Sequence, residues 1–248
     1  MRHLLSLIFA ISCINAAAQM QPDSSVVIMS HWTKGDSAEY KISESSYTVI
    51  GSDTTNMTTS KATLAFKVLK REKDSYTMSL NIKDDKKSGS SNILFTTDSY
   101  GRVQSIDNLE KLTVEGSKHT KQDPSAIRES ISKYLNIFSF HGTKMKLGED
   151  YNGETEVDLS KAGLSQPVKA STNIYLDPEH TNDKFAVARM AVYTEEISDM
   201  PYQQFMSIQI HLGTGWPVVS FFDRFIDTTT EEGIRSTEVQ SEYIELVL

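Results

Sequence analysis

The sequence has 248 residues, of which 38% are hydrophobic, and its 33 acidic against 25 basic residues give a net charge of −8. A chain of this size can bury one large core or two smaller ones. The acidic balance disfavours nucleic acid as a partner, because phosphate backbones repel negative charge. Beyond the leading segment no apolar run reaches the roughly eighteen residues of a membrane helix, so we expect no membrane span.

The leading residues, 1–18, are typical of an export signal. Arg2 supplies a positive start, residues 4–14 form a short apolar run, and the alanines at 16–18 fit the small-residue rule for cleavage. We therefore expect a signal peptide and a mature chain that begins at Gln19. We therefore also expect the protein in the periplasm or at the cell surface of a Gram-negative bacterium.

Cys13 gives an alternative, in which cleavage occurs before this residue and a lipid attached to it anchors the protein as a lipoprotein. It is the one cysteine in the sequence. If the segment 1–18 is removed, the mature chain has no disulfide, no thiol nucleophile and no thiolate metal ligand. Its stability must then come from a packed core.

One clear helix is predicted in the middle of the chain, at 123–142. Asp123 is a suitable N-cap and Pro124 suits the first helical position. Gly142 offers a left-handed stop. Apolar side chains recur with helical spacing and form one stripe: Ile127, Ile131, Tyr134, Leu135 and Phe138. We expect this stripe to pack on a sheet or, alternatively, to cover a cavity above one.

The rest of the chain alternates between apolar and polar residues with a period of two, which is typical of antiparallel sheets with one wet face. Residues 19–30 are polar at first and are expected to form a loose arm. Residues 51–60, GSDTTNMTTS, are expected to form a long hairpin tip. The expected strands lie near 38–43, 47–50, 63–68, 76–82, 92–97, 102–109, 154–159, 171–176, 185–193, 206–212, 216–222 and 234–247.

Glycine motifs recur in the two halves of the chain with nearly equal spacing. Gly35 and Gly101 are 66 residues apart, and Gly148 and Gly215 are 67 residues apart. Each glycine lies in a similar local sequence, which indicates two copies of one β unit with the helix between them. The alternative is that glycine turns are simply common in β proteins.

Together these patterns predict a mainly β fold of two antiparallel units, arranged as a sandwich or as curved, half-barrel sheets, with one main helix near 123–142. The expected divisions are a signal peptide at 1–18, a first β unit at 19–120, a connecting helix at 121–142 and a second β unit at 143–248. Whether the two units form one bilobed domain or two cores is left open.

No pattern in the sequence carries recognisable catalysis. There is no nucleophile elbow and no phosphate-binding glycine loop. Paired acids occur at 84–85, 195–196 and 231–232, in polar turns or at strand ends, where solvated surface is the better interpretation. We expect no metal site, no cofactor and no catalytic residues. A hydrolase with its residues scattered along the sequence is the alternative. The histidines beyond the leading segment lack metal-ligand spacing: His31, His119, His141, His180 and His211.

The motifs Lys34-Gly35-Asp36-x-x-x-Tyr40, Asp98-x-x-Gly101-x-Val103, Leu147-Gly148-Glu149 and Thr214-Gly215-Trp216 resemble a family of exported bacterial proteins catalogued as a domain of unknown function. Glu149 stands where the second copy of that family usually has aspartate. More distantly, the chain is similar to periplasmic lipoprotein carriers. That resemblance implies a curved sheet that holds acyl chains under helix cover.

Two functions from different classes follow as hypotheses. The first is a non-enzymatic binding module for a lipid or another apolar or amphipathic ligand, held between sheet and helix. Its candidate ligand-binding residues are Tyr134, Phe138, Trp32 and Trp216. The second is a structural or protein-interaction component of the cell envelope, with another envelope protein as partner.

Overall fold

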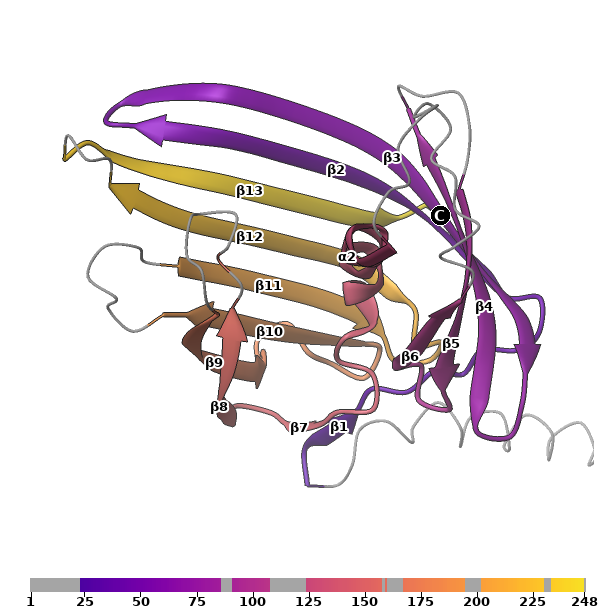
Figure 1. Cartoon of the computed structure of the whole chain (residues 1–248). Helices are drawn as coiled ribbons and strands as arrows, with labels where there is room; N and C mark the ends of the chain where they lie inside the picture. Colours follow the sequence, from indigo (N-terminus) through magenta and orange to yellow (C-terminus); the bar gives the residue numbers. More distant parts are fainter. Residues whose placement is uncertain are drawn as a thin grey trace, which may run out of the picture.

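The computed structural model describes residues 23–85, 91–107, 124–157, 159, 167–194, 202–229 and 233–247. The predicted signal segment and the predicted N-cap Asp123 lie outside these ranges. The protein is mainly β, as the alternating pattern predicted. Within the described residues it contains an eleven-stranded antiparallel sheet, a two-stranded sheet and one α-helix (Figure 1).

The large sheet has the spatial order β6-β5-β4-β3-β2-β13-β12-β11-β10-β9-β8. Its first five strands along the chain are β2 (Ser37–Ile50), β3 (Asp53–Arg71), β4 (Ser75–Asp84), β5 (Ser91–Asp98) and β6 (Val103–Asp107). The other six are β8 (Asp150–Val157), β9 (Val168–Leu176), β10 (Phe185–Tyr193), β11 (Tyr202–His211), β12 (Pro217–Thr229) and β13 (Arg235–Leu246).

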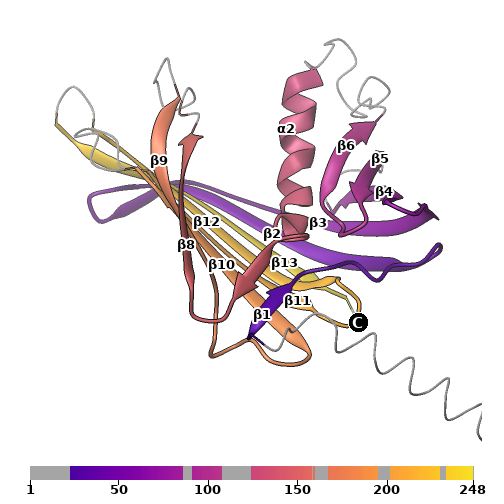
Figure 2. The same cartoon turned by 90° about the horizontal axis from the view of Figure 1, so that it is seen from below.

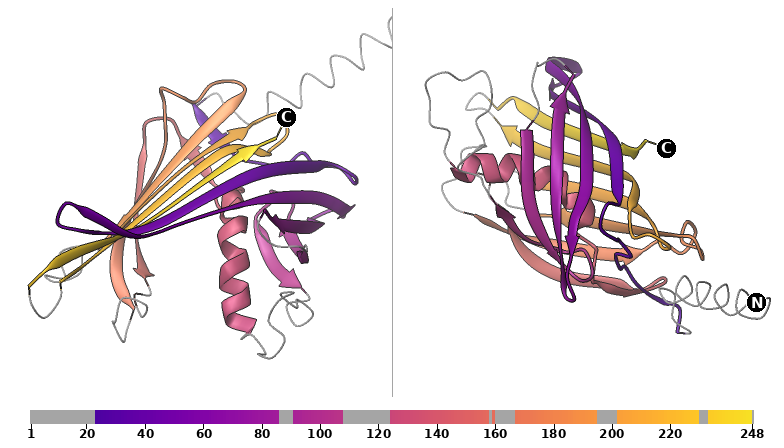
Figure 3. Two further views of the ribbon diagram at one scale, coloured as in Figure 1. Left: turned by 90° about the horizontal axis from the view of Figure 1, so that it is seen from above. Right: turned by 90° about the vertical axis from the view of Figure 1, so that its right-hand side faces the viewer.

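The two predicted β units are two meanders, β2–β6 and β8–β13, that share one continuous sheet. They join where β13 pairs with β2 over eleven residue pairs, from Ser236↔Ile50 to Leu246↔Tyr40. The sheet is strongly curved and remains open, with β6 and β8 as its edges (Figure 3). This continuity means that one concave face runs across both meanders.

The four predicted glycines occupy equivalent places in the two meanders. Gly35 lies two residues before β2 and Gly148 two residues before β8, and these are the first strands of their meanders. Gly101 and Gly215 each lie in the turn between the fourth and fifth strand. All four have positive φ, from 72° to 101°, a conformation that favours glycine.

The predicted hairpin tip at 51–60 is wrong, because β3 begins at Asp53 and pairs with β2 from Ile50↔Asp53 onward. Only Gly51 and Ser52 form the turn. The stretch is polar because it is exposed, but its threonines are well suited to a strand. The polar residues of this stretch therefore indicate that the strand is exposed to solvent, and they do not indicate a loop.

The predicted loose arm at 19–30 is also wrong in its second half. Strand β1 (Ser25–Val27) pairs with β7 (Lys144–Lys146) to form the small sheet. Val26 and Ile28 have no exposed surface and pack with the apolar side chains of β9–β11. Burying these two side chains on the sheet holds the arm in place.

The predicted helix is present as α2 (Pro124–Leu135), followed by the 3-10 turn η2 (Asn136–Phe138). It is therefore shorter than the predicted 123–142. Figure 2 shows α2 on the concave side, between the β4–β6 end and the β8–β9 end of the sheet. Ile131, Leu135 and Phe138 are buried, as their spacing predicted. They form one core with the inner side chains of β2–β5.

Candidate ligand-binding site

Three of the four predicted ligand-binding residues, Trp32, Phe138 and Trp216, meet in one aromatic cluster at the end of η2. The rings of Trp32 and Trp216 stack with centroids 4.5 Å apart, and the Phe138 ring lies 5.5 Å from Trp32 and 6.2 Å from Trp216. The exposed fractions of these side chains are 1% for Trp32, 1% for Phe138 and 8% for Trp216. Neighbouring protein side chains surround the cluster, so ligand contact by these residues stays a prediction.

The turns at Gly101 and Gly215 pack closely against Met29 and Ser30, the residues that shortly precede Trp32. This contact keeps Trp32 in the cluster. A Cβ atom at Gly101 would lie 2.0 Å from Ser30 Oγ, and one at Gly215 would lie 2.3 Å from the Met29 carbonyl oxygen. The Ser30 hydroxyl donates to the Tyr100 carbonyl at 2.8 Å. The repeated glycines therefore let both meanders close on the segment between β1 and β2.

His141 completes the cluster. Its ring is fully buried, 5.4 Å from the Phe138 ring, and its Nε2 lies 2.8 Å from the Gly215 carbonyl oxygen. Because that carbonyl can only accept, Nε2 carries the hydrogen. Burial lowers the pKa of His141 to about 4, so the ring is neutral near pH 7.

Tyr134, the fourth predicted residue, packs against the same core but is not one of the rings in this cluster, and it lies beside a group of charges on the concave face. Lys133 of α2 forms an ion pair with Glu44 of β2, and its ammonium lies 4.5 Å from the centroid of the Tyr134 ring. Glu242 of β13 stands directly opposite Glu44 across the seam of the two meanders. Helix and sheet are thus connected at this seam by one cation and two carboxyl groups.

The carboxyl pair is electrostatically unusual. Burial and the negative charge of Glu44 raise the pKa of Glu242 to about 7, while Lys133 opposes the shift. Burial alone would lower the pKa of Lys133, but the hydrogen bond to Glu44 and the interactions with Tyr134 and the Glu44 charge together outweigh burial and raise it. Near neutral pH the seam therefore contains a cation, a carboxylate and a carboxyl group that is partly protonated.

An apolar row runs along the concave face toward this carboxyl pair. Directly paired residues on neighbouring strands point to the same face of a sheet. The pairing follows an unbroken line from β8 to β3: Tyr151, Ile174, Met190, Met206, Phe222, Glu242, Glu44 and Ser60. We call its first five members the concave row. Ser139, just after η2, donates to the Met206 sulfur, which fixes this as the face that carries the helix.

The concave row is only partly covered. Met206 is buried beneath the segment that follows α2, whereas Ile174, Met190 and Phe222 are half-buried and Tyr151 is 38% exposed. The sequence analysis did not find this row. Each strand shows its own alternation, but only the register places these side chains in one line.

A mainly polar row, interrupted by the buried Val192, lies beside the concave row on the same face, and its members are Thr172, Val192, Gln204, Arg224 and Gln240. Arg224 donates through Nη2 to the Gln240 side-chain oxygen. Its Nε and the Thr172 hydroxyl are enclosed without a hydrogen-bond partner. Apolar surface and unsatisfied polar atoms therefore lie next to each other on this face.

The opposite, convex face also carries exposed aromatic rings. Phe221 is 50% exposed, Phe205 47% and Tyr193 43%. The Phe221 ring lies 4.8 Å from the Tyr243 ring on the neighbouring strand. We call these four residues the convex aromatic patch. It lies on β10–β13, behind the concave row.

Within the described ranges, no group of three histidine, cysteine, aspartate or glutamate side chains is arranged to hold a metal ion. In the same part of the chain, no helix is both long enough and apolar enough to cross a membrane.

No family model matches the chain, and no curated protein matches it. The fold is similar to part of a structure that describes lipid–protein interactions in lipovitellin, with a TM-score of 0.54 and 9% identity. The match covers 88% of this chain and 26% of that chain, so this protein spans about a quarter of the lipovitellin chain. At this identity the likeness shows the fold alone.

A second solved structure, the outer membrane protein OmpT of Vibrio cholerae in a trimeric, in-vitro folded form, matches with 9% identity and a TM-score of 0.23. The match covers 86% of this chain and all of that chain. A score this low carries no argument. The resemblance to the exported family and to lipoprotein carriers stays a prediction.

Proposed function

We propose that this protein is a non-enzymatic binding protein for an apolar or amphipathic ligand of lipid type, which lies along the concave row. The observation that carries the proposal is a line of partly uncovered apolar side chains that leads to the half-buried Glu44–Glu242 pair. Binding sites for small ligands combine such apolar surface with a few polar groups that fix orientation.

The concave row supplies the apolar surface, and the row beside it supplies the polar groups. An apolar chain on Ile174, Met190 and Phe222 would remove their remaining surface from water, which is favourable in proportion to the area buried. A polar head group would lie beside Arg224 and Glu242, where the enclosed Nε of Arg224 lacks a hydrogen-bond partner. The ligand class is therefore amphipathic, with an apolar tail and a hydrogen-bonding head.

The comparison with lipovitellin supports the same ligand class. That structure describes lipid–protein interactions on a chain whose matched part has the fold found here. The likeness covers most of this chain, including both meanders. It agrees with a lipid ligand and leaves both the lipid and its place on the fold unspecified.

Neighbouring residues on opposite faces of β12 provide a matched test. Phe222 belongs to the concave row and Phe221 to the convex aromatic patch. With the neutral apolar fluorophore N-phenylnaphthylamine as probe, Phe222→Ser should weaken binding about fivefold, because a half-buried ring contributes about 1 kcal/mol. Phe221→Ser should leave binding unchanged. Thermal melts of both variants confirm that they fold.

Native mass spectrometry of protein purified from its own envelope then tests the ligand class directly. We expect a retained lipid-sized mass that is released in organic solvent and is reduced in the Phe222→Ser protein. A ligand-free chain that also fails to bind the fluorophore contradicts the proposal, and so does equal weakening by the Phe221→Ser control.

A second candidate function, protein binding, is favoured by the convex aromatic patch. Monomeric proteins rarely expose several large aromatic rings together, and such patches mark interaction sites. The same variants separate the two functions. Loss of a co-purifying envelope protein in Phe221→Ser, with fluorophore binding intact, would favour an interaction role.

Export is part of the proposal, because a lipid-binding protein of the envelope must first leave the cytoplasm. The support comes from the sequence: a charged start, a short apolar run and the alanines at 16–18. N-terminal sequencing of protein from the periplasmic fraction should begin at Gln19. An acylated Cys13 at the N-terminus would contradict the cleavage site and favour the lipoprotein alternative.

A further inference from the structure

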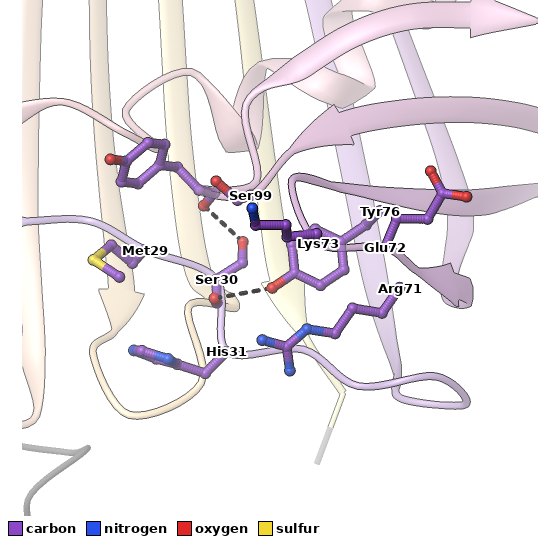
Figure 4. A pocket seen from close by; sticks show the side chains of 9 residues that line it. Met29, Ser30, His31, Arg71, Glu72, Lys73, Tyr76 and Ser99 are labelled. Carbon is purple, nitrogen blue, oxygen red and sulfur yellow. Dashed lines mark hydrogen bonds between the residues drawn. The ribbon is translucent and has the colours of Figure 1, made fainter.

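A separate cavity of about 290 Å³ opens at one rim of the sheet, where β3 turns into β4 and β5 turns into β6. Three segments line it: Met29–His31 before β2, Arg71–Lys73 with Tyr76, and Ser99–Tyr100 (Figure 4). The cavity shares no residue with the concave row. Nothing in the proposed lipid-binding function uses it.

The cavity carries positive charge on a protein that is acidic overall. Arg71 and Lys73 both line it, and no carboxylate among the described residues forms an ion pair with either. Glu72 lies between them in the sequence, but its carboxylate accepts hydrogen bonds from Lys70 and Ser75. In Figure 4 the Glu72 carboxylate points away from Ser30 and His31, toward which the Arg71 and Lys73 side chains extend.

His31 adds a third nitrogen group to the same wall. Its Nε2 is enclosed and has no hydrogen-bond partner, which is uncommon for a buried polar atom. Burial and the nearby charge of Arg71 lower the pKa of His31. An anion in the cavity would reverse the effect of Arg71, because opposite charge stabilises the protonated ring.

The walls of the cavity are held by the fold. Arg71 pairs with Tyr76 across the β3–β4 hairpin, and its guanidinium lies 5.8 Å from the centroid of the Tyr76 ring. The buried Tyr76 hydroxyl donates to the Ser30 carbonyl at 3.2 Å. Ser30 is in turn fixed by Tyr100. Contacts within the fold therefore position Arg71 and the segment that carries His31, which lowers the entropic cost of binding.

We propose that this rim cavity is a binding site for a phosphate group, held by Arg71, Lys73 and His31. Guanidinium groups bind phosphate oxygens through two parallel hydrogen bonds, and an ammonium adds a point charge. The volume suits a phosphate with a small substituent. Free phosphate and a phospholipid head group present the same chemistry, so the test distinguishes these two sources.

The first arm titrates the full mature chain with inorganic phosphate at constant ionic strength, and the His31 ring resonances are followed by NMR. We expect saturable shifts and a rise in the pKa of His31 when phosphate binds. Arg71→Gln should weaken binding at least about tenfold. Lys67→Gln is the matched control, because Lys67 is an exposed cation on the same strand as Arg71, lies outside the cavity lining and should leave binding unchanged.

The second arm measures co-sedimentation with phosphatidylcholine vesicles, with and without phosphatidic acid. Binding that needs phosphatidic acid and is abolished by Arg71→Gln assigns the site to a lipid head group. Saturable binding in the first arm alone assigns it to free phosphate. If Arg71→Gln does not fold, Lys73→Gln replaces it, because Lys73 lies in an exposed turn. Absence of binding in both arms, or equal weakening by Lys67→Gln, overturns the proposal.

Discussion

Glu44 and Glu242 face each other directly across the seam where β2 and β13 join the two meanders, on the side of the sheet that carries the helix. Two carboxyl groups in one partly buried place resist simultaneous ionisation. Lys133 from α2 compensates one of them. The charge state of this pair therefore affects both the stability of the seam and the docking of the helix.

The first prediction concerns the pH dependence of stability. Folding raises the pKa of Glu242 from 4.5 to about 7, so between these values the native state binds more protons than the unfolded state. The Glu242 contribution to the free energy of unfolding thus falls as pH rises through this window. Glu242→Gln removes that contribution and should stabilise the protein by about 1–3 kcal/mol at pH 8, with little gain at pH 4.

Denaturant melts of Glu242→Gln and wild type at several pH values measure this difference. The quantity to compare is the difference in free energy of unfolding between the two proteins at each pH. Both proteins contain His141, whose contribution changes with pH in the opposite direction to that of Glu242. The pKa of His141 falls on folding from 6.5 to about 4, so its contribution to stability declines as pH falls through that window. Glu245→Gln, on the exposed face of the same strand, is the control. A gain that is equal at pH 4 and pH 8 would contradict the assignment.

The second prediction concerns Lys133. Lys133→Met keeps the length of the side chain but leaves two facing carboxyl groups without their cation. We expect a loss of about 1–2 kcal/mol near neutral pH that becomes smaller toward pH 5, because protonation relieves the repulsion. The measurement is again a denaturant melt across pH.

Lys144→Met provides the comparison for this prediction. Lys144 forms an ion pair with Asp23 at 3.5 Å, and both side chains are more than half exposed. Exposed pairs contribute little, so the change should stay within about 0.5 kcal/mol. If the Lys133→Met protein is as stable as the Lys144→Met protein at every pH, the prediction is contradicted. The contact of Lys133 with the two carboxyl groups would then not stabilise the packing of the helix on the sheet.

The sequence predicted those parts of the fold that depend on local pattern. The alternation in Tyr76–Ile82 predicted β4, and the spacing of Ile131, Leu135 and Phe138 predicted one buried helical stripe. The concave row could not be predicted, because it depends on the register of strands far apart in the chain. Glu44 and Glu242 carry no local signal that would bring them together.

The glycine repeat was visible in the sequence, but its physical role was not. Gly35 and Gly101 have nearly the same φ, 97° and 101°, so both suit glycine for conformational reasons. They differ in surroundings: a Cβ at Gly35 meets nothing within 4 Å, whereas one at Gly101 meets Ser30 and His141. Only the three-dimensional packing separates a turn glycine from one at a tight contact.

That difference gives the third prediction. Gly35→Ala should lower the free energy of unfolding by about 1–2 kcal/mol through backbone strain alone. Gly101→Ala carries the same strain and adds overpacking against Ser30, so the loss should reach about 3–5 kcal/mol. Melting curves of the two variants measure the packing contribution by difference.

Gly148 and Gly215 repeat the comparison in the second meander, with φ of 72° and 76°. A Cβ at Gly215 would meet backbone atoms of Met29 and Ser30, which cannot rotate away, and one at Gly148 meets nothing within 4 Å. Gly215→Ala should therefore be the more damaging change of this pair. Equal losses within both pairs would show that conformation alone selects these glycines.

The last prediction separates the aromatic cluster from the proposed ligand site. Phe138 is 1% exposed and its ring contacts Trp32, Phe66 and Trp216, so Phe138→Ala should cost about 3–5 kcal/mol as in a close-packed core. Added lipid should not change that loss. Phe222→Ala removes a half-buried ring and should cost about 1–2 kcal/mol, and it should also reduce the stabilisation that lipid gives the wild type. Denaturant melts of the three proteins with and without envelope lipid extract measure both effects. If lipid restored the stability of Phe138→Ala and acted normally on Phe222→Ala, the ligand would lie at the cluster of Trp32, Phe138 and Trp216, and the concave row would be surface without a ligand.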